Sequence, residues 1–321
     1  MSILLRRTCT TQIERLSDGK TVVTIGEDLA LRVWDGAGGR ERACWRVTLA
    51  KTIHGGLAAY PYGRYVAVAC DDGFGRVVDI ETGAVELLLI GHQNRIWGMA
   101  VSPDGRLILT TGSDRTARLW DATTSDVVHL LIGHTDLVVG ASFSPDERYA
   151  VTGSDDGSVR FWDGTTGTEM QRLVDPRFPM VYAAVSPNMT QVLTGSADGS
   201  VRCWDLAGGR EIWRVAGHHG YINGARISAD GTLGLTAGQD RTARLWNMAT
   251  GEELRRFTWH TSAVHGALFA PDNRHILTCS GDSIARLWHL DWRDAAAHLR
   301  SRLLRDFTDD ERAQYGISAG P

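Results

Sequence analysis

The chain has 321 residues, of which 43% are hydrophobic, so it is long enough to bury a sizeable core. Its formal net charge of −4 excludes an overall basic field of the kind that attracts nucleic acid or an anionic membrane surface. The sequence shows neither a signal-peptide h-region nor an apolar run long enough for a membrane span, and its five cysteines include no closely spaced pair, so we expect a cytoplasmic protein.

Tryptophan recurs along the chain with a period of 42 residues, at Trp120, Trp162, Trp204, Trp246 and Trp288. Upstream, the series extends to Trp34 and then to Val78, where the tryptophan has been lost. Seven units of about 42 residues therefore account for most of the chain. A period in this range is typical of the four-stranded blades of β-propellers.

Each unit contains four short stretches of β-forming residues, and the third unit shows them most clearly. Its stretches are 96–101, 107–111, 117–121 and 127–132. The sequence Ser102-Pro-Asp-Gly and the turn residue Asp114 separate some of them, as expected for tight turns between antiparallel strands. Alternation along the strands is weak because both faces of a propeller blade pack against neighbouring blades.

Three polar residues keep a fixed distance from the tryptophan position. Aspartate lies six residues before it in all seven units, threonine ten residues before it in six, and histidine 28 residues before it in four. A histidine, a threonine hydroxyl, a carboxylate and an indole N–H can form one chain of hydrogen bonds, as buried polar groups require. Four units carry the whole set: His92, Thr110, Asp114 and Trp120; His134, Thr152, Asp156 and Trp162; His218, Thr236, Asp240 and Trp246; His260, Thr278, Asp282 and Trp288.

These features together resemble the WD-repeat β-propellers. The resemblance covers residues 1 to about 290 and depends on Gly-His, Ser-Pro-Asp-Gly and Trp-Asp motifs at the correct mutual distances. It implies an all-β fold, a closed seven-bladed β-propeller of four-stranded antiparallel blades. It also implies that each complete set of histidine, threonine, aspartate and tryptophan is a structural tetrad of its own blade.

Three units depart from the tetrad pattern. The fifth has Pro176 at the histidine position and the first has Arg6 there. The second has Val68 and Val78 in place of threonine and tryptophan, and its His54 is displaced. These departures put the local stability of the three blades in doubt, but not the fold.

The two ends of the chain are expected to differ in structure. The last unit lacks an outermost strand, and the run Ile3-Leu4-Leu5 can fill that gap and close the ring. We therefore divide the chain into a propeller, residues 1–290, and a C-terminal helical tail, residues 291–321. Its ending, Phe307-Thr-Asp-Asp-Glu-Arg-Ala-Gln-Tyr-Gly316, resembles the C-terminal tails of bacterial multidomain signalling proteins that carry WD repeats. The tail either packs on the rim or docks a partner. Its apolar helical face consists of Trp292, Ala296, Leu299, Leu303 and Phe307.

No residue pattern indicates catalysis, a cofactor or a metal ion. The histidines and aspartates recur with the blade period, so the sets do not converge on one centre. The sequence contains no His-Glu-x-x-His, Cys-x-x-Cys or Gly-x-Ser-x-Gly motif. An arginine two residues before each tryptophan position indicates a repeated surface or inter-blade feature and not a nucleic-acid track. These arginines are Arg32, Arg76, Arg118, Arg160, Arg202, Arg244 and Arg286.

The residues that break the repeat are the most informative about function. WD-repeat propellers often bind partners where loops enter the innermost strands, at positions three and five residues after the histidine site and one residue before the turn aspartate. Most of these positions are small or aliphatic here, whereas Arg95 and Trp97 are of types enriched at interface hot spots. Alternatively, Trp97 plugs the central channel or packs against Arg95 alone. We assign to the partner face Arg95, Trp97, Asp71, Asp155, Tyr221, Asn223, Gln239 and His265.

The expected function is a non-catalytic scaffold that binds other proteins or peptides as a monomer, without a cofactor and without binding nucleic acid or membranes. Lys20 and Lys51 are the only lysines, which indicates codon bias in a GC-rich genome and hence a bacterial protein. The resemblance of the tail implies a bacterial signalling or regulatory assembly. Two alternatives are a small-molecule sensor and a hydrolase or lyase that uses the central channel. The enzyme would need several acidic or histidine side chains on the innermost strands, where the sequence has mainly Gly, Ala, Val and Ile.

Overall fold

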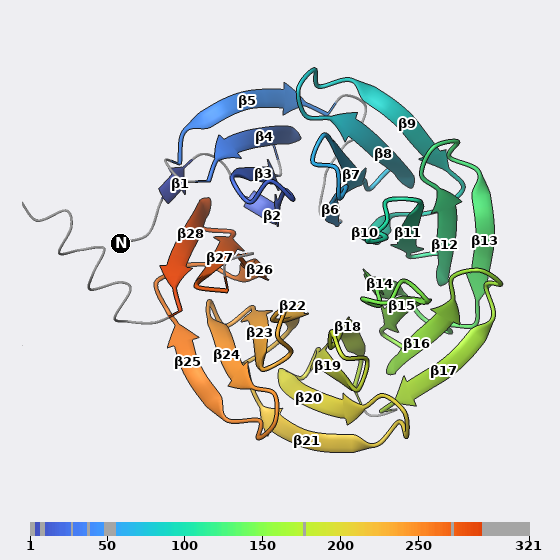
Figure 1. Ribbon diagram of the computed structural model, residues 1–321, viewed down its shortest axis with the longest axis vertical. Coiled ribbons are helices and arrows are strands. Elements are labelled where there is room, and N and C mark those ends of the chain that lie inside the picture. Colours follow the sequence, from blue (N-terminus) through green and yellow to red (C-terminus); the bar gives the residue numbers. More distant parts are fainter. Residues whose placement is uncertain are drawn as a thin grey trace, which may run out of the picture.

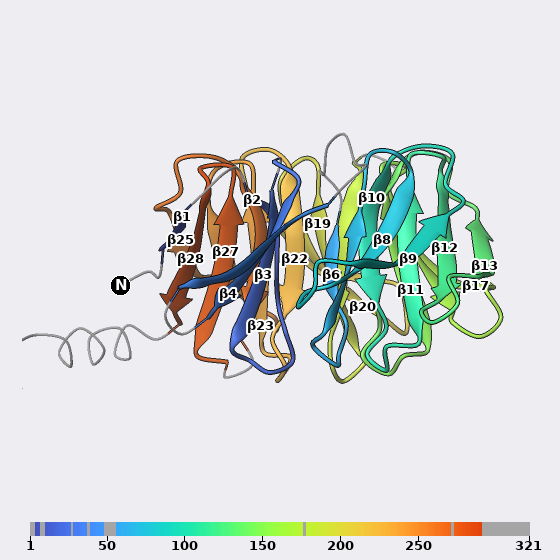
Figure 2. The same cartoon turned by 90° about the horizontal axis from the view of Figure 1, so that it is seen from above.

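The strands of the computed structural model form a ring of seven four-stranded antiparallel blades around a central channel (Figure 1). The structure describes residues 4–6, 10–26, 28–36, 39–47, 56–175, 178–270 and 273–290. Seen edge-on, the strands run between the two faces of the ring (Figure 2). The predicted closed seven-bladed β-propeller is confirmed.

The first four blades follow the chain, each from its innermost to its outermost strand. Blade 1 contains β2 (Thr10–Arg15), β3 (Thr21–Gly26), β4 (Ala30–Asp35) and β5 (Glu41–Arg46). Blade 2 contains β6 (Leu57–Ala59), β7 (Tyr65–Ala69), β8 (Phe74–Asp79) and β9 (Val85–Ile90). Blade 3 contains β10 (Ile96–Val101), β11 (Leu107–Gly112), β12 (Thr116–Asp121) and β13 (Val127–Ile132). Blade 4 contains β14 (Val138–Phe143), β15 (Tyr149–Ser154), β16 (Ser158–Asp163) and β17 (Glu169–Val174).

The last three blades repeat this plan, and the seventh uses both ends of the described chain. Blade 5 contains β18 (Met180–Val185), β19 (Gln191–Ser196), β20 (Ser200–Asp205) and β21 (Glu211–Ala216). Blade 6 contains β22 (Ile222–Ile227), β23 (Leu233–Gly238), β24 (Ala243–Asn247) and β25 (Glu253–Phe257). Blade 7 contains β26 (Val264–Phe269), β27 (His275–Ser280), β28 (Ile284–His289) and β1 (Leu4–Arg6).

The ring is closed by antiparallel pairing of β1 with β28, in which Leu4 lies opposite Arg286 and Arg6 opposite Ile284. The predicted closure by the N-terminal segment is therefore correct, and it removes the open edge that β28 would otherwise present. The predicted tail, 291–321, lies outside the described residues, so its helix and the domain boundary at 290 stay predictions. Within the described part of the chain, no helix is long and apolar enough to cross a membrane.

The tight turns between innermost and second strands are built by their own side chains. Ser102 Oγ donates to Asp104 Oδ1 at 2.6 Å and accepts from the Leu107 amide at 2.9 Å, which holds the turn that the Ser-Pro-Asp-Gly motif predicts. Gly105 adopts a φ of 74°, in the left-handed region that glycine favours. Serine makes the same contacts at Ser144, Ser186 and Ser228.

The tetrads lie in the interior of their blades, with every hydrogen bond between 2.8 and 3.0 Å. In each of the four complete sets, the indole donates to the threonine hydroxyl, which lies beside histidine Nε2, while histidine Nδ1 lies beside the aspartate. Burial alone would raise the pKa of Asp156, but hydrogen bonds from His134 and Ser158 hold that pKa well below its usual value. The tetrads therefore bury polar groups with their partners supplied.

The three blades that lack a complete tetrad fill their interiors in two ways. Blades 1 and 5 keep the indole–threonine bond, at 2.8 Å between Trp34 and Thr24 and at 2.9 Å between Trp204 and Thr194. Blade 2 buries apolar side chains at the equivalent positions. Pro176, His54 and the side chain of Arg6 lie outside the described residues.

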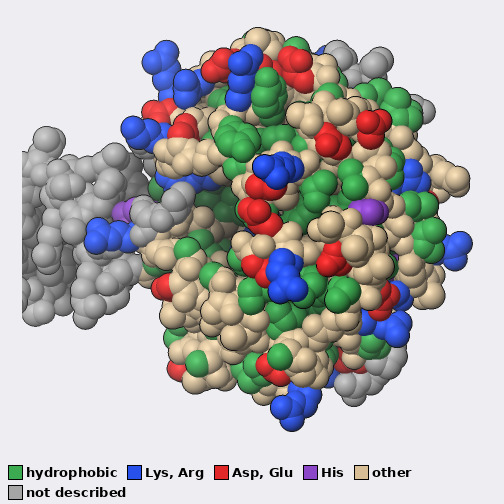
Figure 3. All heavy atoms as spheres, turned by 45° about the vertical axis from the view of Figure 1, so that its right-hand side comes forward, with side chains coloured by type: hydrophobic (Ala, Val, Ile, Leu, Met, Phe, Trp, Pro, Cys, Tyr) green, Lys and Arg blue, Asp and Glu red, His purple; other side chains and the backbone are tan. Residues whose placement is uncertain are grey.

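The arginines that precede the tryptophan positions are mostly interior residues. Burial excludes the surface interpretation for five of them: Arg32, Arg76, Arg160, Arg202 and Arg244. Several pair with the turn aspartate four residues earlier, for example Arg244 with Asp240 at 2.8 Å. Their charge is neutralised inside the blades, so these side chains do not form a track for a polyanion. On the face shown in Figure 3, Lys and Arg side chains are scattered among acidic ones.

Candidate interaction site at the mouth of the central channel

A β-bulge near the start of each of six innermost strands shapes one end of the channel. The register shifts at the second strand residue of β10 (Trp97), β14 (Val139), β22 (Asn223) and β26 (His265), and equivalently in β2 and β18. A bulge leaves one residue unpaired and changes the direction of its side chain. The residues five positions after the histidine site are therefore these bulged residues, and Trp97, Val139, Asn223 and His265 line the channel mouth.

Backbone hydrogen bonds place two further sets of residues beside the bulges. The amide of the residue before the turn aspartate donates to the carbonyl of the residue three after the histidine site. This contact measures 2.8–3.1 Å in five blades: Ser113 to Arg95, Asp155 to Leu137, Ala197 to Pro179, Gln239 to Tyr221 and Gly281 to Ala263. In each of these blades, two positions separated in the sequence are thus brought together beside the bulged residue.

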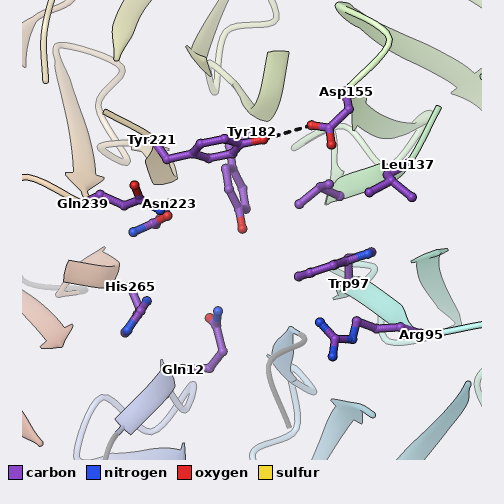
Figure 4. A pocket seen from close by; sticks show the side chains of 11 residues that line it. Gln12, Arg95, Trp97, Leu137, Asp155, Tyr182, Tyr221, Asn223, Gln239 and His265 are labelled. Carbon is purple, nitrogen blue, oxygen red and sulfur yellow. Dashed lines mark hydrogen bonds between the residues drawn. The ribbon is translucent and has the colours of Figure 1, made fainter. Parts of the chain in front are cut away.

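The channel mouth is a cavity of about 490 Å³ (Figure 4). Seven of the eight residues that we assigned to the partner face line it: Arg95, Trp97, Asp155, Tyr221, Asn223, Gln239 and His265. The eighth, Asp71, is not among the lining residues but forms an ion pair with Arg95. The side chains from blades 3 and 4 face those from blades 6 and 7 across the cavity.

Arg95 and Trp97 form one braced unit on blade 3. The Arg95 guanidinium lies 4.7 Å from the centroid of the Trp97 ring and 2.8 Å from Asp71 of blade 2. The Trp97 indole donates to Ser113 Oγ at 2.8 Å. Trp97 thus contacts Arg95 but does not pack against it alone, and the indole remains partly exposed on the wall of the cavity.

Tyr221 and Asp155 form a second unit that spans blade 5. The Tyr221 hydroxyl donates to Asp155 Oδ1 at 3.1 Å. Burial raises the pKa of Asp155, and Asp136 and Asp156 raise it further, against the hydrogen bond from Tyr221. Burial raises the pKa of Tyr221 to about 12, and the neighbouring Asp155 carboxylate is the next largest cause of this shift. The phenol therefore stays protonated at neutral pH and acts as the donor.

The cavity also contains two residues that our sequence analysis missed, Gln12 and Tyr182. Both lie six residues after the histidine site, a position that is glycine in the complete units, for example Gly98. A Cβ at Gly98 would lie 2.4 Å from the carbonyl of Val139, so close strand approach favours glycine there. The replacement of this periodic glycine is a sequence signal that could have identified Gln12 and Tyr182.

Deeper in the channel, a second cavity of about 310 Å³ holds one pair of opposite charges. Glu14 of β2 lies 3.8 Å from Arg226 of β22, and small side chains such as Ala100 and Ala184 form much of the remaining wall. Burial raises the pKa of Glu14 to about 7, although Arg226 lowers it. The expectation of mainly Gly, Ala, Val and Ile on the innermost strands is therefore incomplete, because it overlooked this pair.

The lining residues do not suggest metal or nucleophile chemistry. No group of three or more His, Cys, Asp or Glu side chains in the described residues could hold a metal ion. The cavity instead combines a partly exposed indole, a carboxylate, two phenols and side-chain amides. This mixture of aromatic surface and hydrogen-bonding groups is the composition found at the centre of protein–protein interfaces.

Comparison with known proteins identifies the repeat. The family model for the WD domain, G-beta repeat, matches five stretches, which together cover more than half of the chain: 84–121, 125–163, 178–205, 209–247 and 251–289. The unmatched N-terminal part includes the unit in which valine replaces the tryptophan. No curated protein matches the chain.

Proposed function

This chain belongs to the WD-repeat family, whose propellers generally act as protein-interaction scaffolds, and we propose that it is a non-catalytic scaffold that binds a protein or peptide partner at its channel mouth. The observation that supports this proposal most strongly is the partly exposed Arg95–Trp97 unit on the wall of the 490 Å³ cavity. Arg and Trp anchors in pockets contribute a large share of the binding energy at protein interfaces.

The geometry also suggests what the partner presents. Asp155 receives a hydrogen bond from Tyr221, and no Arg or Lys of the described chain lies within ion-pair distance of it. A donor or cation on the partner would satisfy the remaining acceptor positions of this carboxylate. We therefore propose a partner segment that places an apolar or aromatic group against Trp97 and a hydrogen-bond donor near Asp155.

The test is to measure partner affinity for the wild type and for Trp97→Ala, with Trp259→Ala as the control. Trp259 is 65% exposed and lies beside Trp288, away from the channel mouth. We expect Trp97→Ala to weaken binding by about 2 kcal/mol or more, roughly 30-fold, with little change in melting temperature. Trp259→Ala should bind like the wild type. If every partner captured from the native organism is retained by Trp97→Ala, the channel mouth is not the binding surface.

A small-molecule sensor is a second candidate, supported by the size of the cavity. A volume of about 490 Å³ lies within the usual range for small-molecule sites. A ligand that binds the folded state raises the melting temperature. A screen of metabolites against the wild type and Trp97→Ala separates the two functions, because a sensor would show a Trp97-dependent shift without any partner protein.

We also propose a bacterial, cytoplasmic setting within a signalling or regulatory assembly. Its support is compositional: two of the 34 basic residues are lysines, and the described cysteines, Cys44, Cys70, Cys203 and Cys279, are all free. Fractionation of the native organism, followed by detection of the chain with its partner, tests this setting.

A further inference from the structure

The outermost strands of the blades carry a repeated row of three outward positions. The three positions of each row lie eight, ten and twelve residues after the tryptophan position. The middle residue pairs with the arginine of the third strand that precedes the tryptophan position by two residues. In blade 4, for example, Arg172 lies opposite Arg160, and in blade 3 Leu130 lies opposite Arg118. The repeat thus allows a direct comparison of equivalent surface residues.

The row of β13 is the only fully apolar one among the six outermost strands whose side chains are described. It consists of Val128, Leu130 and Ile132, all exposed, with Ile132 69% exposed. The equivalent rows each contain a charged residue: Arg42 and Arg46 on β5, Glu86 on β9, Arg172 on β17, Arg214 on β21 and Arg256 on β25. Hydrophobic side chains are visible along the right-hand rim in Figure 3, which turns this side of the ring forward.

One edge of β13 is open, and contacts on the inner side of the strand hold it in place. In its sheet, β13 is the last strand and pairs with β12 alone. On its inner side, Leu131 is buried, and His129 Nε2 lies 2.8 Å from the carbonyl of Thr165 in blade 4. An exposed strand edge with apolar side chains and no charge is a template for pairing with another strand.

The arrangement of the row favours a second copy of the same strand. In a two-fold antiparallel pairing centred on Leu130, the two Leu130 side chains face each other and Val128 faces Ile132, so every cross-strand pair of the outward row is apolar. The same pairing of β17, β21 or β25 would place arginine opposite arginine, because Arg172, Arg214 and Arg256 occupy the central position. Like charges directly opposite each other destabilise a strand pair.

We propose that the protein forms a two-fold dimer by edge-to-edge pairing of β13, while arginine at the centre of β17, β21 and β25 prevents the same pairing there. The contact joins two four-stranded blades into one continuous eight-stranded sheet. Because it consists of one short strand pair, the association is weak and depends on concentration. The surface is separate from the channel mouth, so this proposal is independent of the proposed function.

The first experiment is sedimentation equilibrium of the wild type, Leu130→Arg and Leu254→Arg. Arginine already occupies the position of Leu130 in three blades, so the first variant is compatible with the fold, which its melting temperature verifies. Leu254 on β25 is 46% exposed, close to the 47% of Leu130, and strand β25 lies on the opposite side of the ring from β13 (Figure 1). From about 1 to about 500 µM, the wild type and Leu254→Arg should shift from the mass of one chain toward that of two, whereas Leu130→Arg should stay at one.

A cross-linking experiment tests the two-fold axis. In a Cys9→Ser/Cys44→Ser background, Leu130→Cys should form an intermolecular disulfide under mild oxidation, because residues on the axis of an antiparallel pair face each other. Leu254→Cys should not cross-link at the same concentration. A wild type that stays monomeric, as we expected from the sequence, overturns the proposal. So does a Leu130→Arg variant that dimerises like the wild type, or equal cross-linking of the two cysteine variants.

Discussion

Blades 2 and 4 have the same four-strand plan but opposite interiors. In blade 4, Thr152 and Trp162 form part of a buried polar network, with the indole 2.9 Å from the hydroxyl. In blade 2, Val68 and Val78 occupy the two equivalent positions and pack in an apolar cluster with Ile25 and Leu31 of blade 1, against which Trp45 also packs. The blade therefore requires a filled interior, and either a satisfied polar network or apolar packing supplies it.

The turn aspartate is present in both blades and has different partners in each. Asp156 lies 2.9 Å from His134 Nδ1, while Arg160 of the same blade pairs with Glu169. In blade 2, Asp72 binds both terminal nitrogens of Arg76, at 2.6 and 3.1 Å, and the position equivalent to Glu169 is Val85. Asp72 is thus the carboxylate that neutralises a buried arginine, a role that is separable from the tetrad.

The largest expected effect comes from replacing Trp162 of blade 4 with valine, the residue that blade 2 has at the equivalent position, Val78. Trp162→Val removes most of a side chain that is 2% exposed, which packs against Leu119 and Leu131 of blade 3, and it leaves the Thr152 hydroxyl without its indole donor. We expect a loss of about 3 kcal/mol or more in the free energy of unfolding, measured by urea denaturation. Val78→Ala is the control and should cost less, because it removes a much smaller part of a side chain and orphans no polar group. Losses of equal size would contradict this prediction.

The second prediction compares the two aspartates. Asp72→Ala should cost about 2–3 kcal/mol, because it leaves the 2% exposed Arg76 without its carboxylate. Asp156→Ala should cost about 1–2 kcal/mol, because Arg160 keeps Glu169 and Ser158 Oγ lies 3.3 Å from His134 Nδ1. Tetrad composition alone argues for the opposite order, since blade 2 lacks both threonine and tryptophan. Denaturation curves in which Asp156→Ala is the less stable variant would restore that view.

The smallest expected effect is a dependence of the tetrad on acid. The pKa of Asp156 is held below its unfolded value of 3.8, so the unfolded state binds a proton first as the pH falls. The stabilisation is therefore fully present above pH 3.8 and is lost as the pH falls below it toward the folded pKa. In urea denaturation, the stability difference between the wild type and Asp156→Asn should shrink from pH 5 to pH 2. A constant difference would show that the charge of Asp156 does not contribute.

Periodic residues were the part of the molecule that the sequence revealed best. The spacing of His134, Thr152, Asp156 and Trp162 identified residues that the structure places within hydrogen-bond distance. This was possible because each blade repeats one packing environment, so equivalent residues recur at equal intervals. The same reasoning gave the closure by the N-terminal strand, since a missing outermost strand leaves an edge that one remaining segment can fill.

The repeat pattern in the sequence could not predict contacts between different blades. The bond from Tyr221 to Asp155 spans blade 5, and the pair of Glu14 and Arg226 joins blade 1 to blade 6 across the channel. No interval in the sequence encodes such distances, because they depend on how seven blades are arranged around one axis. The contact of Arg95 with Asp71 was also not predicted, because the two residues lie on neighbouring blades.

The sequence by itself determined the number of blades, the tetrads and the closing strand, because each follows from a local pattern repeated along the chain. The tertiary structure alone decided which irregular residues act together. The bulges turn Trp97, Asn223 and His265 into the channel mouth, and ring closure brings Gln12 to the same cavity. The physical reason is that a repeat fixes what each blade buries, whereas the surfaces available for binding arise where different blades converge on the axis or end at the rim.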